Sequence, residues 1–150
     1  MSTLKQQLHT LCLAYVQNRI AAAEEAIAEA QQAANDDTKS SAGDKYETGR
    51  EMMQQETNRN LAQLNEASKL LVALNHTSTA GSSQMADAGS IVYTNNGNFY
   101  LAISAGQIAT DGKNYIAVSP ASPIGYKLKS LVAGNSFDLN GKTYQIISVE

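Results

Sequence analysis

The segment Ser41-Ala-Gly-Asp-Lys-Tyr-Glu-Thr-Gly-Arg-Glu51 decides how the first half of the chain is expected to fold, because it separates two long stretches with heptad spacing. In each stretch the spacing of the mostly apolar seam positions alternates between three and four residues, which is typical of a coiled coil. Two such helices joined by a short connection predict an antiparallel hairpin, with segment 41–51 at its tip. The first seam comprises Leu13, Val16, Ile20, Ala23, Ile27, Ala30 and Ala34, and the second comprises Met53, Thr57, Asn60, Leu64, Ala67, Leu71 and Leu74.

The limits of the two helices follow from the turn-forming residues between them. Neither Gly nor Pro interrupts residues 3–34, whereas residues 35–43 are rich in Asn, Asp, Ser and Gly. The sequence therefore predicts a first helix over residues 3–34, a loop over 35–43 and a second helix from Asp44 to Leu74. The complete hairpin is assigned to residues 1–75.

The second half of the chain changes to the period-two pattern of strands. Residues 76–89 are small and polar and predict a linker, and residues 90–150 predict a separate domain. Asn-Gly and Asp-Gly turn signals separate five predicted strands, at residues 90–94, 98–103, 113–118, 136–139 and 143–149. One short helix, 123–132, is predicted with Ser122 as its cap and Gly134 at its end. The predicted fold class is thus α+β, a coiled-coil hairpin followed by a small antiparallel sheet with one short helix.

Composition and charge exclude several classes of function. The formal net charge is −3, and residues 1–75 hold seven basic and ten acidic side chains while residues 76–150 hold four of each. Such a chain lacks the basic surface needed to wrap nucleic acid, so no independent sequence-specific DNA binding is expected. The single cysteine fits a reducing compartment. Without a signal-peptide pattern or an apolar run of about 18 residues, we expect a cytoplasmic protein that does not contact membranes.

Two segments of the chain resemble motifs of a known protein family. The sequence Ser122-Pro-Ile-Gly-Tyr-Lys-Leu-Lys-Ser-Leu-Val-Ala-Gly-Asn-Ser-Phe137, followed by Tyr144-Gln-Ile-Ile-Ser-Val149, is similar to the C-terminal signature of the Gre family of transcript-cleavage factors. That signature has a Ser-Pro, a short helix with Leu at this spacing, a glycine turn and a closing aromatic-x-Ile strand. Ala42-Gly-Asp-x-x-Glu47 resembles the Gly-Asp-x-x-Glu segment at the family's coiled-coil tip, although the residues after Glu47 differ from the family pattern.

The resemblance implies a partner and a mode of action. The hairpin of a Gre factor enters the secondary channel of RNA polymerase and approaches the 3′ end of the nascent RNA, while an FKBP-like C-terminal domain docks at the channel rim. By this resemblance, docking is expected at and around the short helix, and the residues assigned to it are Ser122, Pro123, Gly125 and Leu128. The chain is then a factor that acts on the polymerase active site and not an enzyme by itself. Stimulation of RNA cleavage and inhibition of the polymerase both stay open.

The acidic residues of the tip have two compatible interpretations. Asp44 followed three residues later by Glu47 is typical of a capping box, and both charges favour a helix N-terminus. The resemblance implies instead that the two carboxylates help to hold a Mg²⁺ shared with the polymerase, since Mg²⁺ accepts one or two protein carboxylates and keeps waters. Tyr46, which either stacks on a nucleotide or packs on the seam, and Glu51, which adds acidity, are assigned to partner contact.

A second class of function is also consistent with the sequence. A structural or chaperone-like coiled-coil protein with a partner-binding globular head needs the same hairpin and domain. A prolyl isomerase is suggested only by analogy of fold, and its cleft should be lined by aromatic side chains, which make up only 6% of this chain.

Overall fold

The computed structural model describes residues 3–40, 44–77 and 84–150, together with the side chains of all of these except 34–50. The contacts divide the chain into two compact units. One comprises residues 1–15 and 71–150, and the other comprises residues 16–70. The ends of both long helices therefore pack with the C-terminal sheet. The boundaries assigned from sequence, at 1–75, 76–89 and 90–150, remain a prediction about which pieces fold independently.

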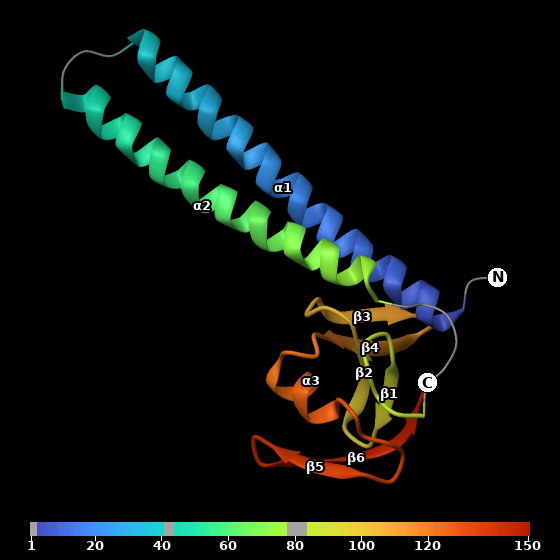
Figure 1. The fold of residues 1–150 in the computed structure, drawn as a ribbon. Helices are drawn as coiled ribbons and strands as arrows, with labels where there is room; N and C mark the ends of the chain where they lie inside the picture. The colour runs from blue at the N-terminus through green and yellow to red at the C-terminus, as the bar shows by residue number, and fades with distance from the viewer. Residues whose placement is uncertain (1–2, 41–43, 78–83) are drawn as a thin grey trace. The chain divides into compact units, whose positions relative to one another are not determined.

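Residues 16–70 form the predicted antiparallel helical hairpin, built from α1 (Leu4–Ser40) and α2 (Asp44–Asn75) (Figure 1). Val16, Ala23 and Ala30 are buried and recur every seven residues, as the first seam requires. The Arg19 guanidinium donates a hydrogen bond across the pair to Oε1 of Gln63, at 3.3 Å. The heptad pattern thus predicted the helix pairing correctly.

The ends of α1 show one unforeseen cap and one error of prediction. Thr3 and Gln6 form a capping box, in which the Gln6 N–H donates to Thr3 Oγ1 at 3.2 Å and the Thr3 N–H donates to Gln6 Oε1 at 3.0 Å. At the other end, α1 continues to Ser40, so the prediction of a loop from Asn35 was wrong. Extending an existing helix needs no new nucleation, which allows residues of weak helix propensity to be added.

The C-terminal half contains six strands: β1 (Ile91–Thr94), β2 (Gly97–Leu101), β3 (Gly106–Thr110), β4 (Lys113–Val118), β5 (Ser136–Leu139) and β6 (Lys142–Val149). Their order in the sheet is β3-β4-β2-β1-β6-β5. The predicted sheet lacked β3 and was wholly antiparallel. The real sheet is mixed, because the chain passes through β3 before β4 returns beside β2 in parallel.

The helix of this half, α3 (Pro123–Leu128), begins as predicted and ends early. The backbone leaves helical geometry at Lys129, and Ser130 adopts a left-handed conformation with φ of 70°. The prediction that the helix extends to Val132 and ends at Gly134 was therefore wrong. Gly134 lies in a later turn, where its N–H donates to the Ile146 carbonyl at 2.8 Å.

One face of the sheet packs against α3. Its core is formed by Ala86, Val92, Phe99, Leu101, Val118, Leu128 and Ile146. Ala86 belongs to the segment predicted to be a linker, and hydrogen bonds fasten it to the chain beyond α3. The ring of Tyr144 stacks on Phe137, with the two centroids 5.0 Å apart, and meets Phe99 edge to face. This packing fixes α3 against the sheet.

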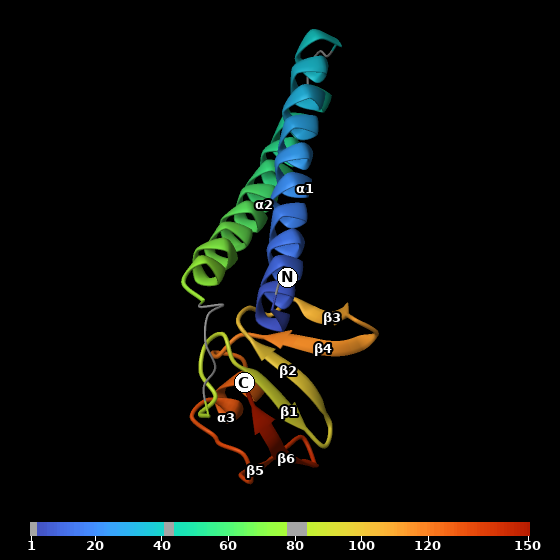
Figure 2. The same ribbon diagram turned by 90° about the vertical axis from the view of Figure 1, so that its right-hand side faces the viewer.

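The first turns of α1 lie beside β3 and β4 in both ribbon views (Figures 1 and 2). Residues 1–15 therefore belong to the same compact unit as the sheet. The Thr110 hydroxyl donates to Gln7 Oε1 at 2.9 Å. Nε2 of His9 lies 3.1 Å from the Leu74 carbonyl oxygen, which ties the ends of the two helices together. Burial raises the pKa of the Tyr100 hydroxyl, and the neighbouring Cys12 thiol adds to this effect. Side chains from both helices and the sheet thus meet in a second core.

Cys12 in this second core should make stability depend on pH. Burial raises the pKa of its thiol to about 11 from an ordinary value of 9.0. Between these values the unfolded chain loses the proton while the folded chain keeps it, so the free energy of unfolding falls as the pH rises. Urea titrations at neutral pH and at about pH 10 should show a loss larger in the wild type than in Cys12→Ala, by about 1 kcal/mol. Equal losses in the two proteins would show that the thiol titrates alike in both states.

Candidate functional site

The N-terminus of α3 is built from a dense set of hydrogen bonds around Ser122. Its Oγ accepts from the Gly125 N–H at 3.1 Å and donates to the Ser119 carbonyl at 2.7 Å. Its own N–H lies 3.1 Å from Oγ of Ser119. Pro123 follows at the first helical position, where a missing N–H costs nothing. The Ser-Pro of the sequence motif thus acts as a helix cap, as predicted.

Gly125 is required by the close approach of α3 to the preceding chain. A Cβ atom at this position would lie 1.8 Å from the Ser119 carbonyl oxygen and 2.9 Å from Ser122 Oγ. No side chain other than hydrogen fits there without a shift of the backbone. The glycine therefore sets the distance between the cap and the end of β4.

The exposed residues of α3 and of its C-cap include one aromatic ring and two cations. Tyr126 is 75% exposed, and Lys127 and Lys129 are also exposed. An exposed ring with two lysines close to it in sequence suits a partner that supplies apolar contact and carboxylates. Sequence reasoning did not select Tyr126. The sequence signal that could have identified Tyr126 as exposed is its position between Gly125 and Leu128, which both lie on the buried face of the helix.

The residues assigned to partner contact differ in their surroundings. Pro123 is exposed and Ser122 is half-buried. Gly125 is buried and Leu128 is 0% exposed, so these two can affect a partner only by holding α3 in place. Their role in binding stays a prediction.

The tip residues are only partly described. Glu51 is exposed on α2. Asp44 and Glu47 lie in the first turn of α2, but the side chains of Asp44, Tyr46 and Glu47 lie outside the described residues. A metal site formed by Asp44 and Glu47 therefore stays a prediction. Among the side chains that the structure does describe, no three His, Cys, Asp or Glu residues are grouped as metal ligands.

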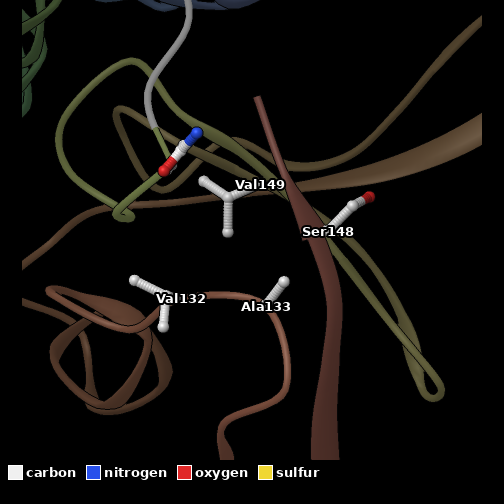
Figure 3. A pocket seen from close by; sticks show the side chains of 5 residues that line it. Val132, Ala133, Ser148 and Val149 are labelled. Atoms are coloured by element: carbon white, nitrogen blue, oxygen red, sulfur yellow. The ribbon is translucent and has the colours of Figure 1, made fainter.

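A pocket of about 500 Å³ opens between β6 and the segment that follows α3 (Figure 3). It is lined by Gln84, Val132, Ala133, Ser148 and Val149. None of these side chains is an acid or a base, so the lining offers apolar contact and neutral hydrogen bonds. General acid–base catalysis cannot come from these five residues.

No family profile, curated protein or solved structure matches the chain. Within the part of the chain that the structure describes, no helix combines the length and apolar character needed to cross a bilayer.

The close contact at Gly125 gives a stability prediction for the candidate site. Replacing Gly125 with alanine forces α3 away from Ser119 and strains the Ser122 cap, so the free energy of unfolding should fall by roughly 2 kcal/mol or more. Lys127→Ala in the same helix serves as the matched control and should change stability by less than about 0.5 kcal/mol. Thermal and urea unfolding of both variants measures the difference. Equal stability of Gly125→Ala and the control would refute the close contact.

Proposed function

We propose that the chain is a Gre-like transcription factor that binds RNA polymerase through the secondary channel and modulates elongation. It has no catalytic activity of its own in this proposal and acts in the cytoplasm on the active site of the polymerase. The C-terminal domain, taken as FKBP-like, docks at the channel rim, and the hairpin reaches inward. The resemblance to the Gre family suggests this function, and the positions of its motifs in the fold support it.

The observation that carries the proposal is the place of the two motifs on the secondary structure. Ser122-Pro123 caps α3 beside a six-stranded sheet, and the Asp44-x-x-Glu47 pair begins the second helix of a long antiparallel hairpin. A tip of this kind can deliver carboxylates into a narrow channel. Its connection spans only the residues between Ser40 and Asp44.

Docking is assigned to the exposed face of α3. Tyr126 supplies a large amphipathic contact surface, and aromatic side chains are enriched among residues that dominate binding energy. Lys127 and Lys129 favour a polymerase surface that carries carboxylates, and they steer the approach of the two proteins. Gly125 and Leu128 contribute by packing α3 on the sheet.

The tip is assigned to the polymerase active site. Side chains at i and i+3 of a helix lie on the same face, so Asp44 and Glu47 can approach one ion together. Mg²⁺ shared with the polymerase would supply charge neutralisation for the attacking and leaving oxygens of the RNA phosphodiester. The polymerase provides its other ligands, since two carboxylates do not hold Mg²⁺ tightly alone. Glu51 is assigned to add negative potential, and Tyr46 is assigned to contact with the RNA 3′ end.

A structural or chaperone-like role is the alternative, and exposed apolar side chains on α2 favour it. Met52 and Val72 are both more than half exposed. A chaperone-like hairpin would bind unfolded chains through such residues and would not depend on Tyr126. Binding of purified RNA polymerase, compared with binding of an unfolded model protein, separates the two functions.

The docking surface leads to a prediction for binding. Tyr126→Ala removes the exposed ring without disturbing the core, so the dissociation constant for RNA polymerase should rise at least about tenfold. Ile147→Ala, at a site 62% exposed on β6, is the matched control and should bind as the wild type does. Biolayer interferometry with immobilised polymerase measures both. If Tyr126→Ala binds normally, α3 is not the docking element.

The tip leads to a prediction for activity. The double change Asp44→Asn with Glu47→Gln keeps size and hydrogen-bonding reach but removes both charges. It should abolish the effect on transcription while polymerase binding persists, at a cost in helix stability of about 1 kcal/mol or less. Glu66→Gln, at an exposed position of the same helix, is the control. RNA cleavage and elongation rates are measured on stalled complexes. An undiminished effect in the double variant would leave the acids as helix caps only.

A further inference from the structure

Two Asn-Gly pairs occupy turns of the sheet, and their surroundings differ. The first is Asn96-Gly97, between β1 and β2. The Asn96 side-chain amide donates to the Thr143 carbonyl at 2.7 Å, and the Asn96 N–H donates to Thr94 Oγ1 at 3.1 Å. The adjacent Asn95 accepts from the Gln145 N–H at 2.7 Å. Hydrogen bonds to β6 therefore hold this turn and the Asn96 amide in place.

The second pair is Asn140-Gly141, between β5 and β6. Both residues are exposed and have left-handed backbones, with φ of 54° and 79°. The nearby Thr143 hydroxyl donates to Asp138 at 2.7 Å and not to Asn140. Among the residues that the structure describes, none forms a hydrogen bond with the Asn140 side chain. No hydrogen bond to a described residue therefore has to break before Asn140 and its backbone reach the geometry in which the amide carbon meets the nitrogen of Gly141.

We propose that Asn140-Gly141 is a site of spontaneous deamidation in the folded protein, with water as the co-reactant. Base removes the Gly141 N–H proton, and the nitrogen attacks the side-chain carbonyl carbon of Asn140. A carbon–nitrogen bond forms, the bond to the amide nitrogen breaks, and ammonia leaves a cyclic imide. Water then opens the ring at either carbonyl, giving aspartate or isoaspartate at position 140. Gly141 offers no side chain to obstruct the attack.

The hydrogen bond on Asn96 decides which pair reacts. The Asn96 amide must leave the Thr143 carbonyl before its carbon can meet the nitrogen of Gly97. Breaking one such hydrogen bond costs about 1 to 1.4 kcal/mol, which corresponds to a rate lower by about five- to tenfold. Asn140 carries no such cost, so it should react first in the native chain.

The product would alter the β5–β6 hairpin. Isoaspartate adds one carbon to the main chain within a two-residue turn that joins the paired residues Leu139 and Lys142. The register of a hairpin depends on its turn, so the pairing next to the turn should loosen. Either product also places a new negative charge near Asp138. The site thus takes water as a reactant and yields isoaspartate, the substrate of isoaspartyl methyltransferases.

The two sites can be compared within one sample. Trypsin cleavage after Lys69, Lys113, Lys129 and Lys142 places Asn96 and Asn140 on different peptides. The full-length chain is incubated at mildly alkaline pH in oxygen-18 water, native and in concentrated urea. Fragmentation mass spectrometry then locates the incorporated label, and methylation by an isoaspartyl methyltransferase reports isoaspartate. Asn140→Gln is the control that blocks the proposed site.

In the native chain, label should enter position 140 about five- to tenfold faster than position 96, and in urea the two rates should converge because both dipeptides are then alike. The Asn140→Gln variant should accept fewer methyl groups than the wild type, and the loss should match the label that the wild type incorporates at position 140. Equal native rates, or faster reaction at Asn96, would overturn the proposal. An absence of label at position 140 in the native chain, with normal labelling in urea, would also overturn it.

Discussion

The rest of the structure depends on the burial of side chains between the sheet and the ends of the two long helices. Leu8, Cys12, Leu74 and Tyr100 have no exposed surface, and together they could not be buried by the sheet or by a helix pair alone. The contacts assign residues 1–15 and 71–150 to one compact unit for this reason. A fragment without the helix ends would expose Tyr100, whose hydroxyl has no hydrogen-bond partner within the described part of the chain.

The opposite face of the sheet packs against α3 and not against the long helices. There Leu128 and the aromatic group of Phe99, Phe137 and Tyr144 hold a helix of only six residues. Such a helix is too short to be stable by itself, so its cap and packing decide its position. Because Gly125 and Leu128 point into the protein, Tyr126 points out. The proposed docking surface is thus a direct consequence of how α3 is anchored, and a mutation in the core can weaken binding without touching the partner.

The strongest local signals predicted the correct structure. The heptad seams gave the hairpin, and Asn140-Gly141 and Asp111-Gly112 gave tight turns whose residues have positive φ. The sequence did not predict β3, because Gly106-Gln-Ile-Ala-Thr110 contains too few large apolar residues to show alternation. Ser122 was identified as a cap from its local motif. Tyr126 was missed because the exposure of a side chain on a six-residue helix depends on packing with residues distant in sequence.

The most direct measurement of the proposed function is a map of the chain's distance from the catalytic metal of RNA polymerase. When Fe²⁺ replaces the catalytic Mg²⁺, the hydroxyl radicals that it generates cut polypeptide within a short radius. We predict cuts in the bound chain confined to the neighbourhood of Asp44 and Glu47, lost when excess Mg²⁺ displaces the iron. A chain that stays bound but is not cut there, or is cut within residues 90–150, would contradict delivery of the hairpin tip to the active site.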